Sequence, residues 1–243
     1  MSSSMVTVSV CPSCDGQGYV CLDVPYTHPA FGRLFPCLEC HYDDALRDAL
    51  NDAGLDYAPP GLREVQPASD AQAVAIQALL RTLERGWGFV YLWGGFGTGK
   101  TYLAESAVRT FVDRALRARD HERRARFWVL PDLMLRLRGG VKEGSVQDLQ
   151  RDLQRVDLLV LDEVDKMHGT PFAREQLFTL IDRRYRAAVR QQRGVTIFTA
   201  NVRPEEVVDG RSSGYFASRV RQAGFFVVPF PGADLRRRFS VEG

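Results

Sequence analysis

The sequence predicts an α/β fold built on a parallel sheet, and three observations predict it. Apolar runs with the length of buried strands alternate with segments of helical periodicity. A glycine-rich turn joins the first of these runs to a helix, and acidic or amide side chains follow two later runs where the strands end. The expected strands are residues 88–93, 126–130, 157–161, 195–199 and 225–228.

A small cysteine-rich segment precedes this fold. All five cysteines lie between residues 11 and 40, and they include Cys11-x-x-Cys14 and Cys37-x-x-Cys40. Two such turns can present four thiolates to one Zn²⁺, and four protein ligands close its tetrahedron, which is typical of a structural ion. So short a segment has little core of its own, so the metal would supply much of its folding free energy.

Other interpretations of the cysteines remain open. Cys21, His28 or His41 could replace one of the four ligands. Disulfides are disfavoured in a cytosolic chain, a redox C-x-x-C is a further alternative, and Cys37–His41 matches the C-x-x-C-H pattern of haem attachment. Haem attachment would require an export signal, and the N-terminus has no basic stretch followed by an apolar one.

A domain boundary is expected after a short helix over residues 42–53. Residues 56–61 form a proline-rich break, which divides the chain into residues 1–58 and residues 59–243. Ser69 or Asp70 then caps an amphipathic helix that ends at Gly86.

The turn after the first strand is a phosphate-binding loop. Residues 94–101 fit G-x-x-x-x-G-K-[ST], with an apolar run before them and a helix-forming run after them. Backbone N–H groups of the loop surround a polyphosphate, Lys100 adds a positive charge and the Thr101 hydroxyl is a ligand for Mg²⁺. A plain glycine-rich turn is the alternative. The candidate nucleotide contacts are Gly94, Gly95, Phe96, Gly97, Thr98, Gly99, Lys100, Thr101 and Tyr102.

Two later strands bring polar groups to the edge of the sheet where the loop lies. The strand over 157–161 continues into Asp162 and Glu163, of which the first would hold Mg²⁺ with Thr101 and the second would polarise an attacking water. Asn201 follows the next strand and could position that water or the γ-phosphate. By themselves, the acidic pair could simply begin a helix and Asn201 could simply form a turn.

The C-terminal region is rich in arginine. Arg219 precedes the fifth strand, and three arginines follow Leu235. A guanidinium that reaches the γ-phosphate of a neighbouring subunit stabilises the transition state, which would make ATP-dependent oligomers the active form. A solvated basic face is the alternative for each arginine.

Together these motifs resemble an AAA+ ATPase, and more narrowly the DnaC/IstB group of helicase loaders and transposition helpers. The resemblance spans residues 62–239 and rests on residues 97–104, 156–164 and 199–201. It implies these roles: Lys100 and Thr101 as the Walker A pair, Asp162 and Glu163 as the Walker B pair, Asn201 as sensor 1, Arg219 as the arginine finger and Arg237 as the sensor 2 arginine. Only about fifteen residues follow the fifth strand, too few for a full C-terminal lid.

The resemblance implies an ATPase of slow, partner-regulated turnover that uses ATP and Mg²⁺. The N-terminal segment would dock the replicative hexameric helicase, and the protein would help to place that ring on single-stranded DNA in replication. Zinc-bearing N-terminal segments are known among such loaders, although the cysteine spacing here is its own. The first alternative is an IstB-like transposition helper, which binds duplex DNA and a transposase. The second is a zinc-dependent adaptor in which bound ATP only fixes a conformation.

Composition sets weaker limits on function. The chain has 243 residues, 45% of them hydrophobic, a net charge of +2 and no run of about 20 apolar residues. No membrane association is expected, and the protein is expected in the cytoplasm. Single-stranded DNA is a possible ligand of Lys142 and of two arginine-rich helical segments. Those segments contain Arg114, Arg117, Arg119, Arg123, Arg124 and Arg126, and then Arg183, Arg184, Arg186, Arg190 and Arg193.

Overall fold

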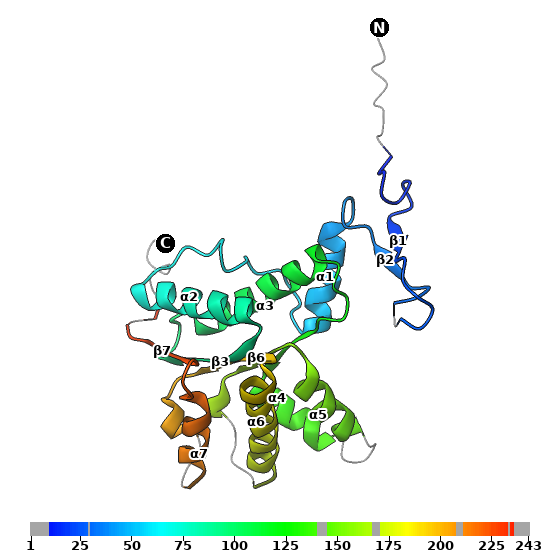
Figure 1. Ribbon diagram of the computed structural model, residues 1–243. Coiled ribbons are helices and arrows are strands. Elements are labelled where there is room, and N and C mark those ends of the chain that lie inside the picture. Colours follow the sequence, from blue (N-terminus) through cyan, green and yellow to red (C-terminus); the bar gives the residue numbers. More distant parts are fainter. Residues whose placement is uncertain are drawn as a thin grey trace.

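A five-stranded parallel sheet lies between two layers of helices (Figure 1). The computed structural model describes residues 10–28, 30–139, 145–166, 171–207, 211–232 and 234–235. The strands run in the order β4-β5-β6-β3-β7, and every neighbouring pair is parallel. Their bounds are β3 Trp87–Gly94, β4 Ala125–Val129, β5 Leu158–Asp162, β6 Gly194–Ala200 and β7 Phe226–Phe230.

All five strands of the sheet were predicted, each to within two residues at either end. The prediction succeeds because a sheet that is covered on both faces needs side chains that are apolar on both faces. In β3, Val90 and Leu92 enter the core on one side of the sheet, whereas Phe89 and Tyr91 enter the core on the other. A continuous apolar run is the sequence signature of such a strand.

The helices divide between the two faces of the sheet. Three helices, α1, α2 and α3, cover one face, and α4, α5, α6 and α7 cover the other (Figure 1). Their bounds are α1 Tyr42–Ala53, α2 Asp70–Arg85, α3 Lys100–Arg117, α4 Leu130–Gly139, α5 Ser145–Arg155, α6 Pro171–Gln191 and α7 Arg211–Val220. None of these helices is long and apolar enough, in the residues that the structure describes, to cross a membrane.

Helix α2 begins and ends where the sequence predicts. The Ser69 side chain accepts a hydrogen bond from the backbone N–H of Gln72, and Gly86 adopts the left-handed conformation that closes the helix. Helix α3 starts at Lys100, directly after the glycine-rich loop, so its N-terminal N–H groups face that loop.

The N-terminal segment consists of a hairpin and the helix α1. Strands β1 (Tyr19–Cys21) and β2 (Leu34–Pro36) pair antiparallel, and they lie beyond the end of the sheet in Figure 1. In contrast, α1 buries Leu46 and Leu50 in the same apolar cluster as α2 and α3. The division of the chain after residue 58 stays a prediction, and α1 is physically part of the core that covers the sheet.

Candidate nucleotide-binding site

The loop between β3 and α3 holds Lys100 in its centre. The Lys100 Nζ atom donates hydrogen bonds to the carbonyl oxygens of Gly94 and Gly95, at 2.9 and 2.7 Å. Lys100 is 7% exposed, so its side chain is buried against the loop, although the residue still contributes to the wall of the adjoining cavity. A helix N-terminus, inward backbone N–H groups and this ammonium group form a site for phosphate.

Two glycines of the loop have no room for a side chain. At Gly94, with φ of +147°, a Cβ atom would lie 2.3 Å from the carbonyl oxygen of Phe230 in β7. At Gly97, with φ of +67°, it would overlap the Asp234 carboxylate. The backbone N–H of Leu235 also donates to Gly97 O at 3.0 Å. The residues after β7 therefore pack directly on the phosphate-binding loop.

A buried glutamine of α2 ties the loop to the neighbouring helix. Gln72 Nε2 donates to Thr98 O at 3.0 Å, and Gln72 Oε1 accepts from the N–H of Ala68 at 2.7 Å. Nothing in the sequence marks Gln72 as a site residue, because its position fits an ordinary polar residue in the first turn of a helix.

Asp162 and Thr101 form an oxygen-lined position beside the loop. The Thr101 hydroxyl lies 3.0 Å from Asp162 Oδ1, and Thr199 Oγ1 donates to the same carboxylate. Neighbouring oxygens around Mg²⁺ are about 3 Å apart, given an octahedron with bonds of about 2.1 Å. Burial raises the pKa of Asp162, and the hydrogen bonds from Thr199 and Thr101 oppose this shift. The oxygen atoms of Thr101 and Asp162 are the kind of ligand that a hard divalent cation prefers.

Glu163 and Asn201 complete this edge of the sheet. Glu163 has a φ of +57°, its N–H donates to Thr199 Oγ1 at 3.0 Å, and its carboxylate pairs with Lys166 at 2.5 Å. Asn201 Oδ1 lies 3.4 Å from Lys100 Nζ. The structure thus brings together the side chains that the sequence placed on three different segments.

One cavity of about 630 Å³ joins these groups. Its walls are the loop, the start of α3, the ends of β5 and β6, and residues that precede α2. Tyr57 also lines the cavity and hydrogen-bonds to Glu105. The lining residues are Tyr57, Gln66, Ala68, Gln72, Phe96, Gly97, Thr98, Gly99, Lys100, Thr101, Tyr102, Glu105, Glu163, Thr199, Ala200, Asn201 and Leu235.

Of the two predicted C-terminal arginines, the structure describes Arg219 alone, and Arg219 is not among the residues that line this cavity. Arg219 lies on α7 between the rings of Tyr185 and Tyr215, at 4.6 and 4.4 Å, and its Nη2 atom is 3.4 Å from Asp182. Arg237 lies outside the described residues, as does Lys142. The finger and sensor 2 roles of these arginines stay predictions.

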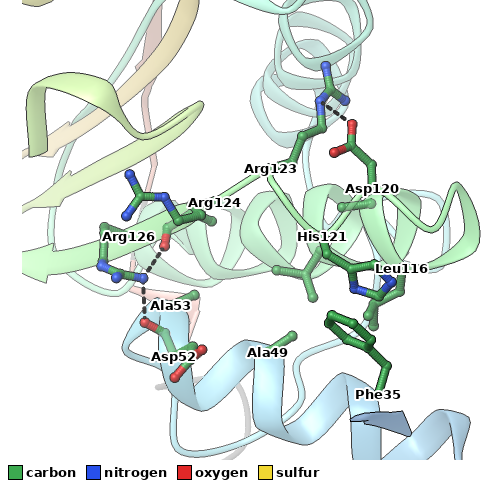
Figure 2. Close-up of a pocket in the computed structure, with 13 residues that line it drawn as sticks. Phe35, Ala49, Asp52, Ala53, Leu116, Asp120, His121, Arg123, Arg124 and Arg126 are labelled. Carbon is green, nitrogen blue, oxygen red and sulfur yellow. Dashed lines mark hydrogen bonds and ion pairs between the residues drawn. The ribbon is translucent and has the colours of Figure 1, made fainter. Parts of the chain in front are cut away.

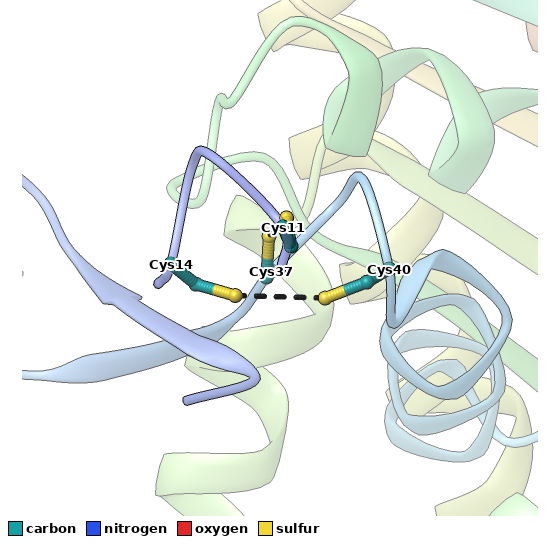
Figure 3. A group of neighbouring side chains, drawn as sticks. All are labelled: Cys11, Cys14, Cys37 and Cys40. Atoms are coloured by element: carbon teal, nitrogen blue, oxygen red, sulfur yellow. Dashed lines mark hydrogen bonds between the residues drawn. The ribbon is translucent and has the colours of Figure 1, made fainter. Parts of the chain in front are cut away.

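The four cysteines of the two C-x-x-C turns meet in one cluster (Figure 3). Their sulfur atoms lie within 4.8 Å of one another, with 3.7 Å between Cys11 and Cys37 and 3.6 Å between Cys14 and Cys40. A tetrahedral zinc with Zn–S bonds of about 2.3 Å places its sulfurs about 3.8 Å apart. Backbone N–H groups, first that of Glu39 and also that of Cys40, help to lower the pKa of the Cys37 thiol to about 7.

Cys21, His28 and His41 lie outside this cluster. Cys21 is exposed, His28 pairs with Glu122, and the His41 ring bonds the backbone of Cys40. The fit to a tetrahedron therefore favours Cys11, Cys14, Cys37 and Cys40 as the set that would hold zinc.

We call the five-stranded sheet and the helices that cover it the sheet domain. A second crevice lies where the hairpin of β1 and β2 meets this domain (Figure 2). It has a volume of about 280 Å³, and Phe35 of β2 stacks on His121 with 4.0 Å between the ring centroids. Arg126, one of the arginines proposed for DNA contact, donates to the carbonyl oxygen of Asp52 and pairs with Asp152. Its guanidinium therefore joins α1, β4 and α5.

Comparison with known proteins identifies the class of this chain. The fold and the loop are those of a P-loop nucleotide-binding protein of the AAA+ type. The family model described as "IstB-like ATP binding protein" matches residues 64–205, more than half of the chain. The chain belongs to this IstB-like ATP-binding family. Among curated proteins, no sequence match is found.

Solved structures agree on the fold. The DnaC helicase loader has a TM-score of 0.55 at 19% identity, covering 70% of this chain and 96% of that one. DnaI has a TM-score of 0.56 at 17% identity, covering 77% and 92%. AMPPCP-bound DnaA from Aquifex aeolicus has a TM-score of 0.56 at 19% identity. That match covers 70% of this chain but only 50% of the DnaA chain. This chain likewise covers 49% of a DNA replication initiation factor and 52% of DnaA bound to AMPPCP and single-stranded DNA.

Proposed function

We propose that this protein binds and hydrolyses ATP as a switch of the DnaC type. The observation that carries the proposal is the convergence of Lys100, Glu163 and Asn201 on one cavity, with Asp162 bound to Thr101 in its wall. Lys100 and the loop bind the phosphates, and Thr101 with Asp162 holds Mg²⁺. Glu163 polarises the attacking water, and Asn201 helps to place it. The other loop residues and Tyr102 surround the nucleotide.

The partner we propose is a replicative hexameric helicase, which the protein would help to place on single-stranded DNA. The likeness to DnaC and DnaI supports this, because this chain covers nearly the whole of both structures. The N-terminal segment also exposes large apolar side chains that suit docking, namely Tyr19, Tyr26, Phe31 and Leu34. The cysteine cluster would hold zinc and keep this surface folded.

A second candidate function is that of a transposition helper. The matching family model carries the IstB-like name, and this supports an ATPase that binds duplex DNA and a transposase. The two candidates share the nucleotide site and differ in the partner, so the partner is the quantity to measure.

The experiment is light scattering during size-exclusion chromatography of the protein mixed with its host's replicative helicase, with ATP and with ADP. A loader gives a ring-sized complex that holds several copies with ATP and fewer with ADP. No complex with either nucleotide contradicts the loader function and directs the search to ATP-dependent assemblies on duplex DNA.

Two variants test whether the nucleotide site controls that complex. Lys100→Ala should bind ATP at least about 10-fold more weakly, because it loses charge-assisted hydrogen bonds to phosphate. Glu163→Gln should bind ATP normally, fail to hydrolyse it and retain the helicase after ATP is added. If Glu163→Gln loads the helicase as efficiently as the parent protein does, ATP hydrolysis is not needed. That result supports a zinc-dependent adaptor that requires ATP binding alone.

A further inference from the structure

The short turn after Glu163, η2 (Val164–Lys166), contains a side chain that holds Asn201. The backbone N–H of Asn201 donates to Asp165 Oδ1 at 3.0 Å, and Asn201 Nδ2 donates to Asp165 Oδ2 at 2.9 Å. Both oxygens of one carboxylate thus bind one residue, which directly follows the neighbouring strand β6. Two hydrogen bonds to the same residue fix its position and the rotation of its side chain.

This contact also sets the direction of the Asn201 amide. A carboxylate only accepts hydrogen bonds, so the amide must turn its NH₂ group toward Asp165. The amide oxygen then faces the other way, and the structure places it 3.4 Å from Lys100 Nζ. The reverse orientation would bring the amide oxygen against a carboxylate oxygen and the amide NH₂ group against the Lys100 ammonium group, so hydrogen-bond chemistry excludes it.

We propose that Asp165 is a positioning residue that keeps the Asn201 oxygen, an acceptor, facing the reacting groups. The inference rests on the ATPase function proposed above. With a nucleotide bound, Lys100 turns to the phosphates, and Asn201 Oδ1 accepts a hydrogen bond from the attacking water. Asn201 therefore orients water and does not donate to the γ-phosphate.

The hydrolysis step then has a defined partner for each proton of the water. The water oxygen bonds to the γ-phosphorus while the bond from that phosphorus to the bridging oxygen breaks, and ADP leaves. Glu163 takes one proton, and Asn201 Oδ1 holds the other. The two acceptors are held by different groups, since Glu163 is held by Thr199 and Lys166, and Asn201 is held by Asp165.

A double-mutant cycle of Asp165→Ala and Asn201→Ala tests this role through the ATPase rate. Asp165→Ala should lower kcat about 10-fold, because a small misplacement of a group that orients the water is costly. The Kd for a non-hydrolysable ATP analogue should stay within twofold. In the Asn201→Ala background, Asp165→Ala should have no further effect on kcat. Asp165→Asn, which keeps one acceptor, should give an intermediate kcat.

A second measurement does not depend on hydrolysis. In NMR spectra, the side-chain NH₂ signal of Asn201, identified by its loss in Asn201→Ala, should be shifted from the free-amide position. In Asp165→Ala it should return there. An unshifted signal, an unchanged kcat in Asp165→Ala or additive losses in the cycle would overturn the inference. A parent protein that binds ATP, has the shifted signal and never hydrolyses would instead contradict the proposed ATPase function.

Discussion

Gln72 shows how one side chain can support a ligand site from outside the motif. Its amide bridges Thr98 O of the phosphate-binding loop and the N–H of Ala68, the residue before the N-cap of α2. The carbonyl of Thr98 needs this partner most, because Thr98 and Gln72 are both 5% exposed and water reaches that hydrogen bond poorly. The loop therefore depends on a helix that the motif does not include.

We expect Gln72→Ala to lower the free energy of unfolding by about 1–3 kcal/mol, because the buried carbonyl of Thr98 and the partly buried N–H of Ala68 lose their partner. The affinity for ATP should fall as well, since Thr98 is no longer held. Urea unfolding and nucleotide titration measure the two effects. Gln77→Ala is the matched control, because Gln77 is exposed on the same helix. Equal stability of the two variants would show that the bridge is dispensable.

At the same scale, the sequence predicted the residues that would contact the nucleotide and the metal better than the residues that hold them in place. Lys100, Thr101, Asp162 and Glu163 belong to patterns with fixed spacing, so the sequence alone selects them. Asp165 and Thr199 act through contacts between neighbouring strands. Such contacts depend on strand order, and the sequence predicted a parallel sheet without its order.

Among the helices, α6 has a buried arginine, Arg184, whose hydrogen bonds join α6 to β6 and to the end of α5. Arg184 donates to Thr196 Oγ1 and Val195 O in β6, and to Leu153 O and Val156 O at the end of α5. It is 3% exposed, and burial lowers its pKa to about 9. The proposal that Arg184 contacts DNA was wrong, because no ligand can reach it. In the sequence, Arg184 looks like its exposed neighbour Arg183.

Arg184→Met should destabilise the protein by about 3–5 kcal/mol, since four buried acceptors lose a charged donor at once. Arg184→Lys should restore only part of this loss, because an ammonium group cannot reproduce the planar fork of the guanidinium. Thermal and urea unfolding are the measurements. Arg190→Met, at an exposed position of the same helix, is the control and should differ little from the parent. A small loss in Arg184→Met would mean that water replaces the guanidinium.

At the scale of the whole molecule, the cysteine cluster and the nucleotide site belong to parts that are held together by different forces. The sheet domain buries two large apolar clusters, one on each face. The hairpin buries few large apolar side chains and exposes Tyr26, Phe31 and Leu34. It joins the domain mainly through α1, where Tyr42 hydrogen-bonds to Asp113 of α3, and through the stacking of Phe35 on His121.

Removing zinc should therefore unfold the hairpin and leave the nucleotide site intact. With zinc bound, the cluster would supply most of the free energy that orders residues 10–41. Helix α1 should stay folded, because its buried leucines belong to the core of the sheet domain. Cys37→Ser removes a proposed zinc ligand that is 1% exposed, and we expect it to lose zinc, to become sensitive to protease in residues 10–41 and to bind ATP with the affinity of the parent protein.

Cys21→Ser is the matched control, since Cys21 lies on the same hairpin, is exposed and is outside the cluster. It should retain one zinc per chain by metal analysis and resist protease as the parent does. The same two variants then separate zinc from ATP in helicase binding. Cys37→Ser should lose the helicase while it still binds ATP, because the docking surface is unfolded. If instead Cys37→Ser keeps the hairpin protected and binds the helicase, the metal is not what orders this segment, and the contacts of Phe35 and Tyr42 with the sheet domain must do so.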